Sequence, residues 1–541
     1  MPGVPSMPQY SPQDITRSLT LGLVWLLGGL ATAAAAAPAD DAPDALHYAD
    51  TAALQERMDR GDLTSEQLVR LFLDRIEAVD DAGPTLNAII EVNPDAIEVA
   101  RDLDQERAVG EKRGPLHGIP VVLKANIDSG DRMATSAGSV ALALHRAPDD
   151  AFHVAALRRA GAVILGKANL SEWANFRSTR SVSGWSSIGG QTRNPHVLDR
   201  NPCGSSSGSA VAVAAGLAVL AVGTETNGSI VCPAGANGVV GIKPTVGLVS
   251  RDGIIPIALS QDTAGPMARS VRDAALLLAA MAAPDNADPA ARAHPGPRDY
   301  LAALDPGALE GARIGVWRQY YGAGSDPRVE AILDAAVARL GELGAEVVDP
   351  IGLAIPEGVG EAEYEVLLYE FRDGLNRYLG NAGMGDDRGS LAALIRYNEL
   401  RADETMPWFG QEIFEQAESR GPLTDEAYLA ARENSGPALR QLIDAVLEEH
   451  ELDAIIAPTN SPAWPIDFVA GDNYSISSSR LGAVSGYPAL TLPAGNVHGL
   501  PVGVTLFGRP WSEPQLIGYA YALEQATRAI LRPGLVPTLE R

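Results

Sequence analysis

The chain has 541 residues, of which 46% are hydrophobic and 20% are charged. It is therefore long enough to bury a large core, and its charge content is that of a globular protein rather than a disordered one. The formal net charge of −26 argues against a polyanionic partner, because an acidic surface repels phosphate groups. We expect no nucleic-acid partner, and a solubilising surface accounts for the acidity.

The first 37 residues are typical of an export signal. Arg17 precedes an apolar run over residues 19–30, and the alanine-rich residues 31–37 offer small-residue cleavage sites. The apolar run is short for a membrane-spanning helix. We expect a signal peptide over residues 1–37, a periplasmic or secreted protein, and no stable membrane insertion after its removal. An uncleaved anchor is the alternative.

The mature chain, residues 38–541, alternates helical and extended patterns. The clearest helix is expected at residues 64–82, where Thr64 and Gln67 form a capping box. Further helices are expected at residues 94–108, 149–160, 207–217, 270–281, 327–343 and 513–526, and strands at 119–123, 162–165, 219–224, 239–242, 313–317, 346–348, 454–457, 489–493 and 502–507. This alternation predicts a single large α/β domain, with a mixed, mostly buried central sheet flanked by helices on both faces.

The connecting segments have their own interpretations. Residues 184–196 are predicted to be a long loop, Ala264-Gly265-Pro266 a turn, and residues 282–307 a linker or surface excursion. Residues 361–449 are mostly helical and have no catalytic motif, which favours a cap or substrate-shaping layer.

Metal and cofactor chemistry is not indicated. None of the eight histidines forms an H-E-x-x-H pair, and no phosphate-binding glycine loop follows a strand. The two cysteines, Cys203 and Cys232, lack CxxC spacing. They form either a disulfide or two separate buried thiols, and we expect neither a metal nor a cofactor.

Residues 201–233 contain two serine-bearing glycine turns, GSSSG and TNGS, separated by a small-residue apolar run. Paired turns of this kind can direct several backbone N–H groups at one point, which is what stabilising a negative oxygen requires. Residues 204–208 match the G-x-S-x-G elbow of α/β-hydrolases, but no strand leads directly into them. A serine-rich helix cap is the simpler alternative.

Lys124 is unusual because it closes an apolar strand. A lysine that extends into solvent from the strand end is one explanation. A catalytic base is the other. With a pKa of about 10.4, only about one lysine in 2,500 is neutral at pH 7, so a base lysine must be desolvated. Val121, Val122 and Leu123 offer such an environment.

Several blocks resemble one family in the same order. They are GPLHGIPVVLKANID, ILGKANLSEWA, GGQTRNP, the Cys203–Ser209 and Gly223–Pro233 segments, GIKPTVGLVS, AGPMARSVRDAALLL, IIAPTN, GYPALTLPAG and LPVGVTLFGR. On these motifs the chain resembles the amidase signature family. The resemblance covers roughly residues 50–280 and 450–530, with the signature core at about 114–280. It implies an amidase catalytic domain over residues 38–541.

The resemblance also implies a mechanism. Ser229 would be the nucleophile, Ser205 a bridging serine after a cis peptide bond, and Lys124 the base. Ser206 would help to hold Lys124. The backbone amides of Thr226, Asn227, Gly228 and Ser229 would form the oxyanion hole. The implied reaction converts a carboxamide into a carboxylic acid and ammonia through an acyl-enzyme.

Departures from the common family pattern affect substrate choice. Glu225 and Asn227 replace the frequent Asp and Gly, and Val231 stands where many members have Arg. Asn227 either contributes its side chain or tolerates special backbone angles. Trp464 and the Gly184–Gly190 loop are candidates for lining the pocket, and a core or surface position is the alternative for Trp464.

Within the family the chain most resembles bacterial peptide amidases. This resemblance implies a peptide or small-molecule amide substrate, and specifically a C-terminal peptide amide. A broad aliphatic, aryl or fatty acid amide hydrolase is the alternative. A tRNA-linked amidase subunit fits poorly with the export signal and the acidity. A non-catalytic binding protein is disfavoured because all three candidate catalytic residues are present.

Overall fold

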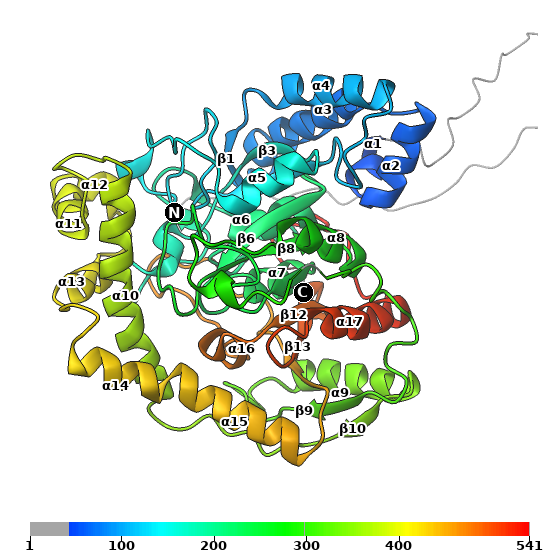
Figure 1. Cartoon of the computed structure of the whole chain (residues 1–541), viewed down its shortest axis with the longest axis vertical. Coiled ribbons are helices and arrows are strands. Elements are labelled where there is room, and N and C mark those ends of the chain that lie inside the picture. Colours follow the sequence, from blue (N-terminus) through cyan, green and yellow to red (C-terminus); the bar gives the residue numbers. More distant parts are fainter. Residues whose placement is uncertain (1–42, 297, 540–541) are drawn as a thin grey trace, which may run out of the picture. The chain divides into compact units, whose positions relative to one another are not determined.

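A computed structural model describes residues 43–296 and 298–539, and the predicted signal peptide lies outside these residues. Pro43–Arg541 cluster as one compact unit. Its centre is an 11-stranded mixed sheet with the strand order β1-β3-β2-β6-β8-β7-β12-β13-β11-β9-β10 (Figure 1). Among the described residues, no helix is both long and apolar enough to cross a membrane.

The strands of the sheet are β1 (Ile89–Val92), β2 (Pro120–Lys124), β3 (Val163–Ala168), β6 (Leu220–Glu225), β7 (Val240–Lys243), β8 (Thr263–Ala268), β9 (Arg313–Val316), β10 (Glu346–Val348), β11 (Ala454–Pro458), β12 (Ala489–Val497) and β13 (Leu500–Phe507). Parallel and antiparallel pairs are mixed: β2 runs parallel to β3 and β6, whereas β8 runs antiparallel to β6 and β7. Every residue of β2, β3 and β6 is buried, which explains their continuous apolar runs.

The helices are α1 (Pro43–His47), α2 (Thr51–Arg60), α3 (Ser65–Arg75), α4 (Ala96–Ala108), α5 (Phe152–Arg159), α6 (Ser207–Ala214), α7 (Val231–Asn237), α8 (Val271–Met281), α9 (Pro327–Glu342), α10 (Val359–Asn381), α11 (Leu391–Leu400), α12 (Ala402–Thr405), α13 (Glu412–Glu418), α14 (Glu426–Asn434), α15 (Gly436–Glu449), α16 (Arg480–Ser485) and α17 (Glu513–Thr527). Helices α4, α6, α7, α8, α9 and α17 pack against strands of the sheet. The expected α/β class with a buried mixed sheet is confirmed.

The predicted capping box at the start of α3 is present. The Thr64 side chain accepts from the Gln67 N–H, and the Gln67 side chain accepts from the Thr64 N–H. The helical pattern continues beyond Arg75 as a π-helical turn over Ile76–Asp81. The long expected helix is therefore one segment with two hydrogen-bonding patterns.

Two predictions about connections are wrong. Ala264-Gly265-Pro266 is not a turn but the middle of the buried strand β8, paired with β6 through Val222 opposite Pro266. Glycine and proline favour turns locally, and sheet pairing overrides that preference here. The predicted loop at residues 184–196 contains a small hairpin, β4 (Trp185–Ser186) and β5 (Gly190–Gln191).

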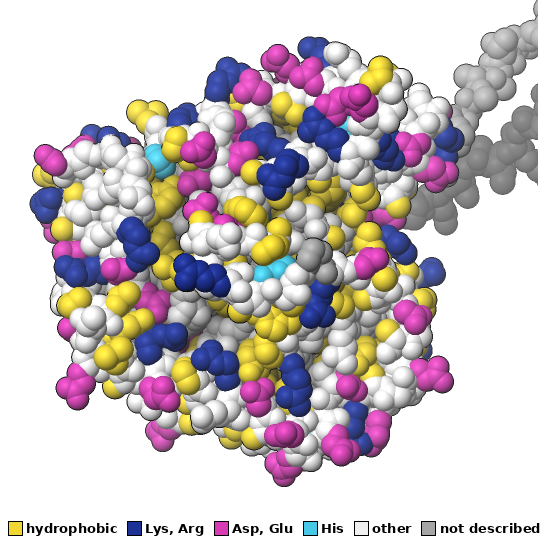
Figure 2. All heavy atoms as spheres, in the orientation of Figure 1, with side chains coloured by type: hydrophobic (Ala, Val, Ile, Leu, Met, Phe, Trp, Pro, Cys, Tyr) yellow, Lys and Arg dark blue, Asp and Glu magenta, His cyan; other side chains and the backbone are white. Residues whose placement is uncertain are grey.

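Helices α10–α15 form the predicted helical region at 361–449 (Figure 1). A fully buried ion pair ties this region to the core. Glu172 and Arg177 belong to the segment after β3, and both side chains are completely buried. The Arg177 guanidinium also donates to the Thr405 carbonyl at 2.7 Å and lies 4.5 Å from the Phe409 ring centroid. On the face shown in Figure 2, acidic and basic side chains are interspersed around the periphery.

Replacing Arg177 with Met should leave the Glu172 carboxylate buried without its cation. We expect the free energy of unfolding to fall by about 3–5 kcal/mol, and the double variant Arg177→Met/Glu172→Gln to recover part of that loss. Urea-induced unfolding followed by circular dichroism measures both. The exposed Arg180→Met is the control. A wild-type unfolding midpoint for Arg177→Met would contradict the assignment.

Candidate active site

Lys124 is the last residue of β2 and is completely buried. Its Nζ lies 2.8 Å from Ser205 Oγ, 2.9 Å from Thr224 Oγ1 and 3.1 Å from the Thr224 carbonyl oxygen. Burial lowers the pKa of Lys124 to about 7, an effect that the negative charges of Glu225 and Asp262 partly oppose. The side chain does not extend into solvent. Near neutral pH a large fraction of this lysine is therefore unprotonated.

The first glycine turn brings Ser205 to that lysine. The Gly204–Ser205 peptide bond is cis, as the family resemblance implies. A Cβ on Gly204 would lie 2.2 Å from Ser171 Oγ, so a larger residue before Ser205 would displace the Ser171 side chain. Ser205 itself is fully buried, and its carbonyl accepts from the Ser171 N–H at 3.2 Å. Helix α6 begins two residues later, and no strand enters the turn as a hydrolase elbow requires.

The second turn, which follows β6, lies directly against the first. The Ser206 N–H donates to the Ser229 carbonyl at 3.1 Å. Ser229 is 8% exposed, whereas Lys124 and Ser205 are 0% exposed. Of the three predicted catalytic residues, Ser229 is thus the only one with any exposed surface, and its neighbours Asn227 and Gly228 line the cavity described below.

Ser206 supports Lys124 indirectly, through Thr224. Its hydroxyl donates to the Thr224 carbonyl at 3.0 Å and accepts from the Thr224 N–H at 3.2 Å. It therefore holds Thr224, which in turn contacts Lys124, and has no direct bond to the lysine among the described residues. Thr224 is the lysine partner that sequence reasoning missed, because a threonine inside a strand pattern has no distinguishing signal. Asn126 also donates to Thr224 Oγ1, at 3.1 Å.

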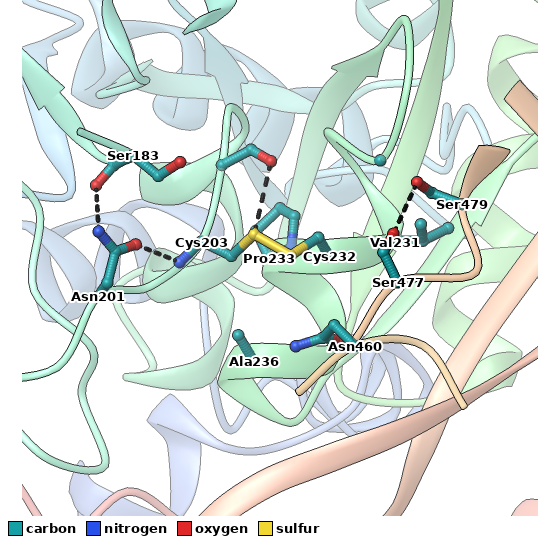
Figure 3. Close-up of a disulfide and its surroundings, with 12 residues drawn as sticks. Ser183, Asn201, Cys203, Val231, Cys232, Pro233, Ala236, Asn460, Ser477 and Ser479 are labelled. Atoms are coloured by element: carbon teal, nitrogen blue, oxygen red, sulfur yellow. Dashed lines mark hydrogen bonds between the residues drawn. A yellow bond between two sulfur atoms is a disulfide. The ribbon is translucent and has the colours of Figure 1, made fainter. Parts of the chain in front are cut away.

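The two cysteines form a disulfide, which decides the alternative left open by the sequence. Cys203 lies two residues before Ser205 and Cys232 three residues after Ser229, so the bond joins the two serine turns covalently (Figure 3). The Asn201 side chain supports the first turn by accepting from the Cys203 N–H at 2.8 Å.

The Glu225 carboxylate holds the second turn by accepting hydrogen bonds from its backbone. It is buried and accepts from the N–H groups of Gly228 at 2.9 Å, Ile230 at 2.7 Å and Val231 at 3.0 Å. This corrects one predicted oxyanion donor, since the Gly228 amide is already engaged. The backbone amides of Thr226, Asn227 and Ser229 have no hydrogen-bond partner in the described chain, whereas the Thr226 hydroxyl donates to Asp262 at 2.5 Å.

A cavity of about 500 Å³ opens onto both turns. Its lining includes Gly204, Gly228 and the disulfide, together with α10 and the segment between β11 and α16. Trp464 lines the cavity, as one of its two interpretations predicted, and its side chain is largely buried. The Gly184–Gly190 loop does not line it, although the preceding Ser183 does. Two tyrosines extend this aromatic wall. The ring centroid of Tyr474 lies 6.0 Å from that of Trp464, and the ring centroid of Tyr321 lies 6.2 Å from that of Tyr474.

The arrangement can do serine-based acyl transfer. It has a buried amine with a lowered pKa, two serines in adjoining turns, unpaired backbone amides and an open cavity. Among the described residues, no group of three or more His, Cys, Asp or Glu side chains is placed to hold a metal ion.

These features define an amidase, and the chain belongs to the amidase signature family: the Amidase profile matches residues 67–517. The protein is a hydrolase that cleaves the C–N bond of a carboxamide. It is 52% identical to the solved native peptide amidase from Stenotrophomonas maltophilia, over 90% of this chain and 98% of that chain, with a TM-score of 0.85. A structure of a peptide amidase in complex with the competitive inhibitor chymostatin is 53% identical and has the same coverage and TM-score.

A protein of Arabidopsis thaliana named as a probable amidase is 41% identical, over 86% of this chain and 87% of its own length.

Proposed function

We propose that this enzyme hydrolyses C-terminal peptide amides to the free peptide acid and ammonia. The 52% identity to a solved peptide amidase over 98% of that protein carries the choice of substrate class. The cavity supports it, because about 500 Å³ holds more than a small aliphatic amide. The aromatic wall of Trp464, Tyr474 and Tyr321 offers apolar surface to the residues that precede the amide.

In the proposed mechanism Ser229 Oγ attacks the carboxamide carbon. Its proton passes to Ser205, whose own hydroxyl proton passes to Lys124. The negative charge that forms on the carbonyl oxygen is stabilised by the backbone amides of Thr226, Asn227 and Ser229. The C–N bond then breaks while the proton returns from Lys124 through Ser205 to the leaving nitrogen, which departs as ammonia. Water attacks the resulting ester and releases the carboxylic acid and Ser229.

The surroundings of Lys124 suit a neutral amine. A neutral Nζ has two N–H donors and one lone pair. The two oxygen atoms of Thr224 accept the two donors, at 2.9 and 3.1 Å. The lone pair is then free to face Ser205 Oγ at 2.8 Å. Thr224 thus orients the lysine so that it accepts a proton from Ser205.

We also propose that the protein is exported. The support is the signal-like residues 1–37 together with the disulfide, because disulfides persist in oxidising compartments. Mass spectrometry of the native protein recovered from a periplasmic or secreted fraction should find an N-terminus near residue 38. Full-length protein confined to the cytoplasm, with both thiols free, would overturn this proposal.

Ammonia release from a panel of substrates tests the function. The panel contains dipeptide amides, N-acyl amino acid amides, aliphatic and aryl amides, and glutamine. We expect the highest kcat/KM for peptide amides, and a loss of at least about a thousandfold in Ser229→Ala and Ser205→Ala, because the residues act as a unit. Ser209→Ala, a buried serine of α6 that bonds the Val222 carbonyl, is the control and should keep its activity. Faster turnover of an aliphatic amide than of every peptide amide would refute the substrate class.

The pH dependence of kcat/KM tests the role of Lys124. Because the base must be neutral and the pKa of Lys124 is lowered to about 7, activity should rise with pH through an inflection near 7 and then level off. Thr224→Val removes an oxygen that favours the ammonium form, so the inflection should move to lower pH. A rate that is flat from pH 5 to 9, or an inflection that moves upward in Thr224→Val, argues against this role.

A further inference from the structure

Asn227 stands where the family frequently has glycine, and two explanations were open: special backbone angles or a working side chain. The structure excludes the first. Asn227 is not among the residues with positive φ, whereas the next residue, Gly228, has a φ of 84°. Because the backbone at Asn227 does not require a residue that tolerates positive φ, the side-chain amide is the feature that needs an explanation.

Both ends of the Asn227 side chain are held. Its Nδ2 donates to Glu363 Oε1 at 2.6 Å, and its Oδ1 accepts from Ser479 Oγ at 2.7 Å. Glu363 belongs to α10 in the helical region, and Ser479 immediately precedes α16. The turn that supplies the candidate oxyanion donors is therefore fastened from two separate parts of the chain.

Glu363 reaches the same turn by a second route. Its Oε1 also accepts from Gln261 Nε2 at 3.3 Å, and that Nε2 lies 3.3 Å from the Thr226 carbonyl, to which it can donate. The Glu363 side chain is 5% exposed, and Arg480 Nε is 3.2 Å from its Oε2. A buried carboxylate with a cation and several donors is held in one geometry, which suits a fixed support.

We infer that Glu363 is a positioning residue for the second glycine turn, residues 226–229, and that it acts through the Asn227 side chain. This inference rests on the proposed function, in which the backbone N–H of Asn227 stabilises the transition state. Glu225 holds the turn through Gly228, Ile230 and Val231, and Glu363 holds its other side through Asn227. Oxyanion donors contribute fully only when they are preorganised, so a loosened turn should slow the chemical step.

The test compares Glu363→Ala, Asn227→Gly and the double variant on one peptide amide. Each single change should lower kcat by about 10- to 100-fold while KM changes less than about threefold, because a displaced donor acts in the transition state. The kcat of the double variant should be no lower than that of the less active single variant, because both single changes remove the same contact. Glu363→Gln keeps an acceptor oxygen and should retain most of the activity. The exposed Glu361→Ala, on the same helix, is the control.

A peptide aldehyde supplies a readout that a general loss of stability would not move. Aldehydes form a tetrahedral adduct with a serine nucleophile, so their inhibition constant should rise in proportion to the loss of kcat/KM. Thermal unfolding of each variant checks that it is folded. Additive losses in the double variant, a loss confined to KM, or unchanged aldehyde affinity would overturn the inference. If Ser229→Ala were fully active, the proposed function itself would fail; an inactive Ser229→Ala with a fully active Glu363→Ala would reject the positioning role alone.

Discussion

The buried amine of Lys124 is the interaction on which the rest of the site depends. Among the described residues no carboxylate contacts Lys124 directly, and its buried Nζ is bonded only to the oxygens of Thr224 and Ser205. Desolvation therefore favours the neutral form, and the pKa falls to about 7. Because the lysine is at the end of a central strand, the sheet determines where the neutral amine lies. Both serine turns are built around that position.

The turns are held by contacts from several directions. The disulfide joins them covalently, and Ser206 bonds the first turn to the Ser229 carbonyl of the second. The Glu225 carboxylate accepts from backbone amides of the second turn, and Glu363, on α10, accepts from the Asn227 side chain of the same turn. Helix α10 also lines the cavity, so the helical region contributes both to the pocket and to the support of the turn.

Sequence reasoning found the parts of this site that have local patterns. Lys124 stands out because a charged residue closes an apolar strand, and Ser205 lies in a turn that matches a family motif. Thr224 and Glu363 have no such pattern, and their roles arise from contacts between segments distant in sequence. Gly265 and Pro266 misled the prediction because sheet pairing overrides local turn preference. The donor role of the Gly228 amide was excluded only by the position of the Glu225 carboxylate.

The central claim is that Ser229, activated by Lys124 through Ser205, forms the covalent intermediate. Rapid acid quenching during turnover of a slowly deacylated peptide ester or amide, followed by peptide mapping with mass spectrometry, tests it most directly. We expect an acyl group on Ser229 in the wild-type enzyme and none in Lys124→Ala at neutral pH. An acyl group on Ser205, or an unmodified Ser229 under conditions where the substrate accumulates as acyl-enzyme, would contradict it.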